Sequence, residues 1–470
     1  MLDSAATARA KLGTMGTLEP RILERAQHPV SRRDIDPNVL KVLYRLIGAG
    51  QVAYLVGGGV RDLMMGRRPK DFDVATSAHP TQVRELFRNS RLIGRRFRLV
   101  HVFFGAQNIE VATFRRRSEE VVEGDDPLIR HDNTFGTAAE DAFRRDFTVN
   151  ALFYDPATFR VVDFTGGVAD LRAGLIRTIG DPELRMREDP VRMIRAVRFA
   201  VKLGFAIEPA TYAAMERHRG DLVKAAVPRL VEETFRTLAL VGAEQAFMLL
   251  DRLGILEILL PSIAEHVSRD ELARVHMVAN LAALGRVLEA GEEVSRSFVL
   301  ACLYADYHLS RVREGSADDR FRLVDALRRH GYSKADTEEM RLLLDAMGHI
   351  AKRSRALRRL SRRPCFAEAR RLWEMVAPTL GIAPLTLEVL LAPPPRPLAN
   401  TGPGRRRRRR RGGRRRRARG PTPPAGVEHS MGNGAAGSAP KETPPPLVES
   451  APEPAPKVAV AKYTGPDGQS

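Results

Sequence analysis

Residues 54–76 read YLVGGGVRDLMMGRRPKDFDVAT, an apolar run followed by a triple glycine and then two aspartates one residue apart. The apolar run and the segment 71–76 have the composition of strands, with a short helix between them. Alternate residues of a strand point to one face, so the carboxylates of Asp71 and Asp73 are expected about 6–7 Å apart along the strand. Two like charges this close favour a cation between them, and Mg²⁺ prefers one or two carboxylates together with substrate phosphates.

The glycines at 57–59 let backbone N–H groups approach a phosphate where a side chain would block them. Eleven residues separate Gly59 from Asp71, and the whole arrangement resembles the nucleotidyltransferase superfamily that includes DNA polymerase beta. On this resemblance Gly58, Gly59 and Arg61 are expected to hold phosphate. The alternative is a strand edge that carries two solvated aspartates beside a tight turn.

The charge of the chain points to a polyanionic partner. The net charge is +19 over 470 residues. Residues 400–470 hold twelve Arg and three Lys against four Glu and one Asp, which leaves +9 for the remainder. The part of the chain outside this segment is therefore basic in its own right.

Composition also excludes several classes of protein. The two cysteines, Cys302 and Cys365, supply neither a disulfide framework nor a Cys-rich metal site, and both thiols are expected to pack within the fold. No apolar run reaches the length of a membrane span. Residues 1–20 lack the apolar core of a secretory signal. These features predict a cytoplasmic protein without stable membrane insertion.

The order of apolar patterns predicts an α+β protein with a mixed sheet in its head, an all-α neck and body, and a disordered basic tail. The expected segments are an irregular N-terminal segment 1–30, a head 31–178, a neck 179–250, a body 251–393 and an Arg/Pro-rich tail 394–470. The resemblance to nucleotidyltransferases implies a catalytic head, a neck that binds the nucleotide base and RNA, and an RNA-binding body.

Within the head, apolar spacing predicts helices over 36–47 and 81–88. Strands are expected over 53–57, 71–76, 97–104 and 108–114, and the polar residues 117–141 are expected to form a mobile loop. From residue 181 the pattern is almost wholly helical and shows no clear strands. The first helices of that region are expected over 188–203, 209–217, 228–238 and 243–253.

Residues 92–102, LIGRRFRLVHV, resemble the signature of bacterial poly(A) polymerases within the class II nucleotidyltransferases, whose other main members are the CCA-adding tRNA enzymes. The resemblance covers about residues 28–260. Arg95 and Arg96 are adjacent and so point to opposite faces of a strand, which lets one of them, assigned here as Arg95, reach the nucleotide. The alternative is a pair of solvated charges at a strand edge.

Glu110 is a polar residue in the apolar segment NIEVATF. If its strand neighbours the strand of Asp71 and Asp73, Glu110 becomes a third metal ligand. The other interpretation, a carboxylate on the wet face of the sheet, remains open, as does completion of the metal site by Asp146.

Residues 144–150, RRDFTVN, resemble the family motif that binds the sugar and triphosphate of the incoming nucleotide. The resemblance assigns Arg144 and Arg145 to phosphate, for which the planar guanidinium is suited. Asp146, also placed among the catalytic residues, and Asn150 are assigned to the ribose. The alternative is a capping aspartate flanked by surface arginines.

Residues 188–195, EDPVRMIR, resemble the family motif EDxxRxxR. On one helix Asp189, Arg192 and Arg195 lie at offsets of zero, three and six, so the first two are neighbours. An acceptor and a donor there imitate a Watson–Crick edge and read a base without a template. A capping aspartate in a local salt bridge is the alternative. Residues 163–171, DFTGGVADL, resemble the motif that joins head and neck, as a hinge or as a plain turn.

The resemblance implies a poly(A) polymerase that adds AMP from ATP to RNA 3′ ends, with two Mg²⁺ ions about 3.5–4 Å apart held mainly by Asp71 and Asp73. A CCA-adding tRNA enzyme is the alternative, and a non-catalytic RNA-binding protein is the alternative of another class. The implied partners are ATP and RNA 3′ ends, with contact to RNA-degradation machinery left open. The arginines within 405–419 are expected to tether RNA without reading its sequence.

Overall fold

The computed structural model describes residues 19–94, 99–116, 135–313, 319–354 and 356–382. The chain divides into a unit of residues 1–396 and a unit of residues 397–470. Three of the expected features lie outside the described residues: Arg95 with Arg96, residues 117–134 of the expected loop, and the basic tail. No helix in the described part is long and apolar enough to cross a membrane.

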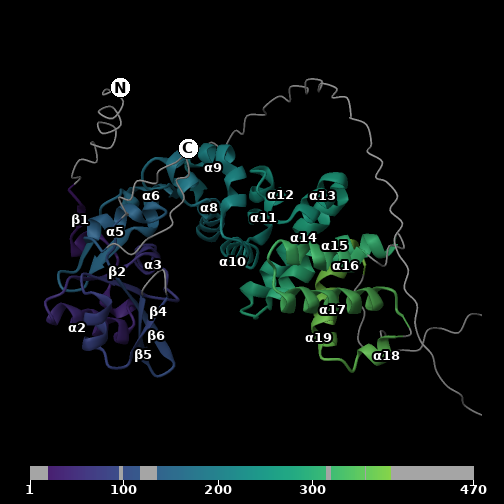
Figure 1. The fold of residues 1–470 in the computed structure, drawn as a ribbon, viewed down its shortest axis with the longest axis horizontal. Helices are drawn as coiled ribbons and strands as arrows, with labels where there is room; N and C mark the ends of the chain where they lie inside the picture. The colour runs from purple at the N-terminus through teal and green to yellow at the C-terminus, as the bar shows by residue number, and fades with distance from the viewer. Residues whose placement is uncertain (1–18, 95–98, 117–134, 314–318, 355, 383–470) are drawn as a thin grey trace, which may run out of the picture. The chain divides into compact units, whose positions relative to one another are not determined.

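The head is built on an eight-stranded mixed sheet in the order β1-β8-β7-β2-β3-β6-β5-β4 (Figure 1). One pair, β3 with β6, is parallel, and every other neighbouring pair in this sheet is antiparallel. The strands are β1 Arg21–Leu23, β2 Ala53–Val56, β3 Asp73–Thr76, β4 Ser90–Ile93, β5 Leu99–Phe104, β6 Gln107–Thr113, β7 Leu152–Asp155 and β8 Arg160–Asp163.

The two faces of this sheet pack on different helices. Leu55 and Val74 belong to one apolar cluster with the buried residues of α2 (Pro37–Gly48). Val56 and Ala75, one residue further along each strand, belong to a second cluster that includes Ala142 of α5 (Ala138–Arg144). Successive side chains of a strand point to opposite faces of the sheet, so neighbouring residues pack into different apolar clusters. The head also contains α3 (Gly58–Met64), α4 (Pro80–Leu86) and α6 (Gly167–Ala173).

The expected helix over 36–47 is confirmed as α2. Asp36 precedes it, and its side chain accepts a hydrogen bond from the backbone N–H of Asn38 at 2.7 Å. Pro37 occupies the first turn, where its missing N–H costs nothing. Val39, Val42, Leu43 and Leu46 are buried along one stripe of the helix, and each contributes on the order of 1.5–3 kcal/mol through burial.

Two expectations about the head are wrong. The segment 1–30 is not wholly irregular, because β1 pairs antiparallel with β8 at the edge of the sheet. The segment 117–141 contains the start of α5, where Thr137 and Glu140 form a capping box. A three-residue strand carries too few side chains to show a period. The capping box was a local signal for α5 that the sequence reasoning overlooked.

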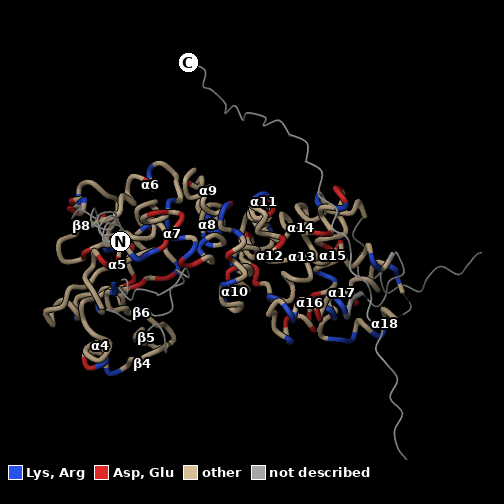
Figure 2. Tube along the Cα trace, turned by 45° about the horizontal axis from the view of Figure 1, so that its top comes forward, with Lys and Arg blue, Asp and Glu red and all other residues tan. Residues whose placement is uncertain are grey.

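The neck and body are helical, with basic and acidic positions interspersed along them (Figure 2). A two-residue parallel pair, β9 Leu175–Ile176 with β10 Ala206–Ile207, corrects the expectation of no strand beyond residue 181. In the described part of the neck and body, the α-helices are α7 Pro182–Glu188, α8 Val191–Leu203, α9 Pro209–His218, α10 Val227–Leu238, α11 Ala243–Arg252, α12 Leu256–Leu259, α13 Pro261–Arg269, α14 Glu271–Glu289, α15 Arg296–Arg313, α16 Asp319–Arg329, α17 Lys334–Ala351, α18 Leu357–Leu360 and α19 Cys365–Val376.

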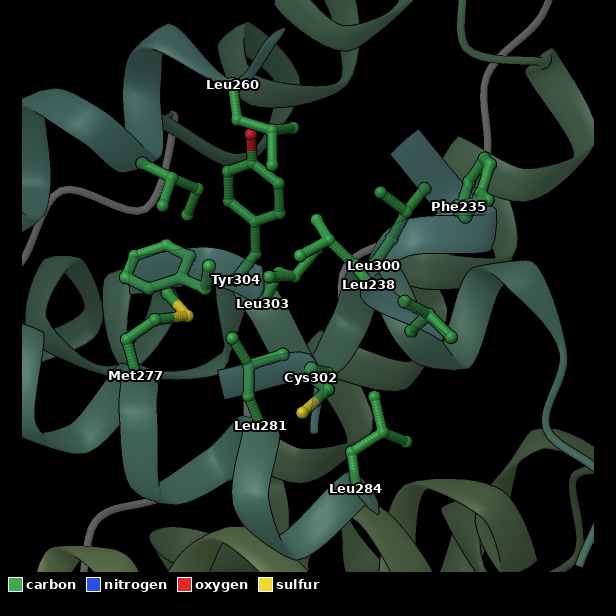
Figure 3. Close-up of a cluster of buried hydrophobic side chains, with 14 of the residues drawn as sticks. Phe235, Leu238, Leu260, Met277, Leu281, Leu284, Leu300, Cys302, Leu303 and Tyr304 are labelled. Carbon is green, nitrogen blue, oxygen red and sulfur yellow. The ribbon is translucent and has the colours of Figure 1, made fainter. Parts of the chain in front are cut away.

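One large apolar cluster runs from the head segment that contains Phe147 and Val149 through the neck to Trp373 in the body. Figure 3 shows its centre, where side chains of α10, α14 and α15 meet. Cys302 is fully buried there, and burial raises the pKa of its thiol to about 12. It packs as a small apolar residue, as expected, whereas Cys365 is half-buried.

The junction of head and neck is a tightly bonded turn. One carboxylate, that of Asp163, accepts hydrogen bonds from four consecutive backbone N–H groups, those of residues 165 to 168, at 2.9–3.0 Å. Gly166 adopts a left-handed conformation with φ +82°. The backbone of Gly167 lies so close to Thr148 that a methyl group on Gly167 would sit 2.2 Å from the Thr148 carbonyl oxygen. These contacts favour the interpretation of residues 163–171 as a turn.

Gly167→Ala should therefore destabilise the protein, because the added methyl forces two backbone segments apart. We expect a loss of about 1–3 kcal/mol, as for other overpacked sites. The measurement is the urea midpoint followed by circular dichroism. Gly48→Ala is the matched control, since a methyl there meets open space at the end of α2. An equal midpoint for Gly167→Ala and the control would contradict the close approach.

Candidate active site

The sheet brings three carboxylates together at the start of β3. Asp73 is the first residue of that strand, and its register partner on the parallel strand β6 is Glu110. Register partners on parallel strands point to the same face of the sheet. Glu110 therefore lies on the same face as Asp73, which is the arrangement that a third metal ligand requires. Asp71 lies two residues before Asp73, just outside the strand, which corrects the expectation that β3 extends over 71–76.

A histidine continues the same row of side chains. On β5 the register partner of Glu110 is His101, and the distance between its Nε2 and Glu110 Oε1 is 3.4 Å. His101 Nδ1 is 3.2 Å from the side-chain amide nitrogen of Asn108. This histidine belongs to the segment LIGRRFRLVHV, but the sequence reasoning did not single it out.

The carboxylates at this end of the sheet carry unbalanced negative charge. Within the described part of the chain, the side chains of Asp71 and Asp73 have no hydrogen-bonding or ion-pair partner. Partial desolvation raises the pKa of Asp73, the charges of Glu110 and Asp71 raise it further, and Arg145 opposes them. A divalent cation relieves such crowding directly. In the described residues, no group of three or more His, Cys, Asp or Glu is arranged as a preformed site for a metal.

Glycines place α3 directly against these carboxylates. Gly57 precedes the helix at φ +69° and ψ −135°, a conformation that glycine adopts readily. A methyl group on Gly59 would lie 3.4 Å from the backbone carbonyl oxygen of Asp71. Gly58 begins the helix between them. The start of α3 and the start of β3 therefore lie side by side, as the pattern in residues 54–76 predicts.

Arg61 of α3 is bonded to protein groups. Its side chain is 3% exposed. It donates to Asn150 Oδ1 at 2.6 Å, and two of its nitrogens donate to Asp62 Oδ1 at 2.9 and 2.7 Å. In this arrangement it positions Asn150, whereas the sequence had assigned it to phosphate.

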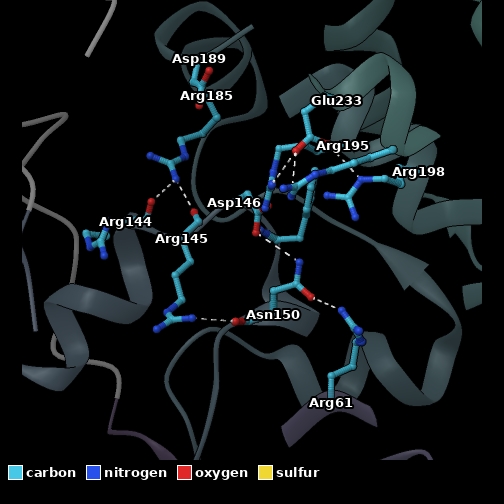
Figure 4. A network of polar contacts seen from close by, with 12 residues as sticks. Arg61, Arg144, Arg145, Asp146, Asn150, Arg185, Asp189, Arg195, Arg198 and Glu233 are labelled. Carbon is cyan, nitrogen blue, oxygen red and sulfur yellow. Dashed lines mark hydrogen bonds and ion pairs between the residues drawn. The ribbon is translucent and has the colours of Figure 1, made fainter. Parts of the chain in front are cut away.

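Asp146 is the centre of a network that joins head and neck (Figure 4). Its Oδ2 accepts from Arg195 of α8 at 2.9 and 2.5 Å. Its Oδ1 accepts from the backbone N–H of Phe147 at 2.8 Å and from the amide of Asn150 at 3.3 Å. Burial opposes ionisation of Asp146, but Arg195 and these hydrogen bonds together lower its pKa to about 2. Asp146 is therefore a permanent anion at neutral pH.

The network extends through Arg195 to the neck helix α10. Glu233 accepts from Arg195 at 3.3 Å and from Arg198 at 2.9 Å. The guanidinium carbons of Arg61, Arg195 and Arg198 lie 5.5, 5.4 and 4.4 Å from the centre of the Phe199 ring. Cation–π attraction to one ring thus helps to gather three arginines from head and neck. The sequence reasoning did not identify Phe199 or Glu233.

Asp141 is a further functional candidate that the sequence reasoning missed. It is buried, and its carboxylate accepts from Arg144 at 3.0 Å and from Arg145 at 3.1 and 2.9 Å. Burial opposes ionisation, but the two arginines lower its pKa overall. Arg145 also donates to the backbone carbonyl of Asn150 at 3.3 Å. The available signal was spacing, since Asp141 stands three and four residues before these arginines.

The expectation that Asp189 and Arg192 share a helix is wrong. Helix α7 ends at Glu188, and α8 begins at Val191. Asp189 has φ −146° and ψ 87°, outside the helical region, because the ring of the following Pro190 disfavours the α conformation at this position. Asp189 instead accepts two hydrogen bonds from Arg229 of α10, at 3.0 and 2.8 Å.

Arg192 is buried and bonds to groups at the end of α7. It donates to the backbone carbonyl of Arg185 at 2.8 Å and lies 3.4 Å from Glu188 Oε2. Desolvation lowers the pKa of Arg192, and the charges of Asp189 and Asp146 oppose this. The three residues of the motif thus face different partners: Asp189 binds α10, Arg192 binds α7, and Arg195 binds the head.

Two parts of the chain match models of known protein families. Residues 53–177 match the Poly A polymerase head domain, and residues 204–267 match the family described as the probable RNA and SrmB-binding site of polymerase A. Over these two ranges the chain is therefore similar to poly(A) polymerases. It is 50% identical over 256 residues to poly(A) polymerase I of Escherichia coli O157:H7, which covers 53% of this chain and 55% of that protein.

The chain is also similar to CCA-adding enzymes. The CCA-adding enzyme of Lactobacillus helveticus is 41% identical over 218 residues, 46% of this chain and 53% of that enzyme. The crystal structure of the Bacillus stearothermophilus CCA-adding enzyme in complex with CTP aligns with a TM-score of 0.58 and 28% identity over 74% of this chain and 80% of that chain. The chain spans about half the length of the curated relatives it matches.

The Asp146–Arg195 pair predicts a specific pH dependence of stability. The pKa of Asp146 is about 2 in the folded protein, against an ordinary value of 3.8 for a solvated aspartate. Its ionised form therefore stabilises the fold above pH 3.8, and this contribution disappears as the pH falls towards 2. The contribution is about 2 kcal/mol. The difference in unfolding free energy between the wild type and Asp146→Asn, from urea titrations, should shrink from pH 5 to pH 3. A constant difference over this range would contradict the assignment.

Proposed function

We propose that this chain is a template-independent poly(A) polymerase that transfers AMP from ATP to the 3′ ends of RNA and releases pyrophosphate. The observation that carries the proposal is the cluster of carboxylates at Asp71, Asp73 and Glu110 beside a glycine turn, of which Asp71 and Asp73 have no ion-pair partner among the described residues. The identity of 50% to poly(A) polymerase I over about half the chain supports AMP as the nucleotide that is added to the acceptor. The match of residues 204–267 supports RNA as the acceptor.

Asp71 and Asp73 would hold two Mg²⁺ ions, with Glu110 as a third ligand on the same face. Bound divalent ions lower the pKa of an attacking hydroxyl and neutralise the charge of a leaving pyrophosphate. The protein itself does little covalent chemistry. Its part is to position the RNA 3′-hydroxyl and the α-phosphate and to supply fixed charges around them.

The triphosphate is expected to approach the start of α3 at Gly58 and Gly59. Arg144 and Arg145 supply positive charge held in place by Asp141. The carboxylate of Asp146 stays ionised and can accept a hydrogen bond from a ribose hydroxyl. Asn150 has its amide oxygen on Arg61 and its amide nitrogen near Asp146, so Arg61 and Asn150 position Asp146.

The base is expected to meet Asp189 and Arg192 at the corner between α7 and α8. The two side chains supply an acceptor and a donor, the combination needed to pair with a base edge. Asp189 is 18% exposed and shares its oxygens with Arg229, which is 52% exposed. A base that pairs with Asp189 would take the place of Arg229 on these oxygens.

Two other functions remain as alternatives. A CCA-adding enzyme is favoured by the identity of 41% to the Lactobacillus helveticus protein. A non-catalytic RNA-binding protein requires that the carboxylates serve no reaction. Purified protein, Mg²⁺, an unstructured RNA and each single NTP separate the three. Long products from ATP alone indicate a poly(A) polymerase, two or three nucleotides added to tRNA ends indicate a CCA-adding enzyme, and no product with any NTP indicates an RNA-binding protein.

Asp71→Asn and Asp73→Asn should each abolish nucleotide addition and leave the protein folded. Each substitution removes a ligand charge, which costs several kcal/mol of transition-state stabilisation. The measurement is the single-turnover rate of AMP addition, with circular dichroism as the check on folding. Asp155→Asn, on β7 of the same sheet, is the control and should retain the wild-type rate. Near-normal rates in both site variants would mean that the metal lies elsewhere.

Substitution of the base-reading residues should change which nucleotide is used. In Asp189→Ala and Arg192→Ala the ratio of kcat/KM for ATP over CTP should fall, because an unpaired polar edge is where such discrimination arises. The control is Arg236→Ala, an exposed arginine of α10 paired with Glu232. Unchanged ratios in both site variants would place base selection elsewhere in the protein.

A further inference from the structure

The segment between α17 and α19 concentrates positive charge. Residues 351–364 read AKRSRALRRLSRRP, which contains seven basic residues and no acidic one. The short helix α18 lies in its middle, and Figure 2 shows basic positions along the tube around it. Six of these residues are described, and we call them the α18 basic surface: Lys352, Arg353, Arg358, Arg359, Arg362 and Arg363.

All six side chains of the α18 basic surface are exposed. Among the residues that the structure describes, none of the six is in an ion pair or donates a side-chain hydrogen bond. Some other exposed arginines of the neck and body do have carboxylate partners. Arg269 pairs with Glu265 at 2.5 Å, and Arg236 pairs with Glu232 at 2.9 Å. The α18 basic surface differs from these positions because it gathers six exposed basic residues, without a carboxylate partner in the described part of the chain, within twelve positions of the sequence.

Buried groups hold the backbone beneath these charges in one conformation. Leu357 is 3% exposed and Phe366 is 6% exposed, and both belong to the large apolar cluster. Ser354 accepts from the backbone N–H of Ala356 at 3.3 Å and lies 2.9 Å from His349 Nδ1. An ordered backbone that carries like charges close together is electrostatically unfavourable unless an anion lies nearby.

The chemistry of the segment favours phosphate as that anion. Five of the six residues are arginines, whose guanidinium matches a phosphate with two parallel hydrogen bonds. No large apolar side chain within the described residues of 351–364 is strongly exposed, so the apolar anchors of a membrane-surface helix are missing there. The segment also contains no aromatic residue on which a base could stack. The segment is therefore suited to contact the phosphate backbone of a nucleic acid without reading its sequence.

We propose that the α18 basic surface binds the phosphodiester backbone of RNA upstream of the 3′ end that enters the head. This inference rests on the proposed function for the identity of the acceptor. Binding there adds affinity for long RNA by releasing counterions and leaves the chemistry of nucleotide transfer unchanged. It gives the body a role in retaining the RNA between successive additions.

The test compares two variants that lose the same charge. In the α18 variant, Arg358, Arg359, Arg362 and Arg363 are changed to Gln. In the control variant, four arginines with carboxylate partners are changed to Gln: Arg160, Arg217, Arg269 and Arg370. Because both variants lose four positive charges, any difference between them reports the position of the charge. Thermal unfolding checks that both remain folded.

Affinity for a long unstructured RNA is measured by fluorescence anisotropy between about 50 and 200 mM salt, without ATP or Mg²⁺. Each phosphate contact to a single strand contributes about 0.7 to the slope of log affinity against log salt. We expect the slope of the α18 variant to be less steep by about 2–3 and that of the control to stay near wild type. A variant with Lys at the same four positions should recover most of the slope.

Equal slopes and affinities in the α18 variant and the control would overturn the inference. The inference would also be overturned if the α18 variant bound RNA as the wild type does but no longer sedimented with phosphatidylserine vesicles. That result would make the surface a lipid contact. AMP addition to a short oligonucleotide is the separate readout for the proposed function, and the α18 variant should retain it. A wild-type protein that adds no nucleotide but shows the slope difference would refute the proposed activity and leave the RNA surface standing.

Discussion

The ion pair between Asp146 and Arg195 connects groups 49 residues apart, and the candidate site depends on it. A buried carboxylate is costly unless a cation and hydrogen bonds compensate it. Asp146 meets both conditions only when α8 of the neck lies against the head. Through Asn150 the same carboxylate is linked to Arg61 of α3, and through Arg195 it is linked to Glu233 of α10. The positions of the glycine turn, of residues 144–150 and of the neck are thus coupled by charge.

The carboxylates of the head fall into two environments, which separate two tasks. Asp146 and Asp141 are buried against arginines, and their pKa values are lowered. Asp73 lies beside other carboxylates, and its pKa is raised. A carboxylate that is already paired with arginines gains no stabilisation from a metal ion. A carboxylate that is crowded by other carboxylates is stabilised by one. The pattern of compensation therefore supports placing the metal at Asp71 and Asp73, with Asp146 in a positioning or ribose-binding role.

The same principle distinguishes the arginines. In the neck, Arg195, Arg198 and Arg229 are bonded to carboxylates and hold the fold. Around α18 the described basic side chains are exposed and have no such partners. Like charges gathered on a surface repel one another, and a bound polyanion would relieve this repulsion. A basic protein can thus use one residue type both to join its segments and to hold a nucleic acid.

Local sequence by itself determined the helix over 36–47, the glycine turn and the identity of the paired aspartates, because each depends on the backbone preferences of neighbouring residues. It also contained Pro190, which keeps Asp189 out of the helix that begins at Val191, and the overlooked capping box that starts α5. Only the tertiary structure decided that Glu110 lies beside Asp73, since strand register is set by both layers of the core. It also decided that Arg61 and Asp189 bind other side chains, because a buried or half-buried charge takes whichever partner the packing brings near, and that partner is often distant in sequence.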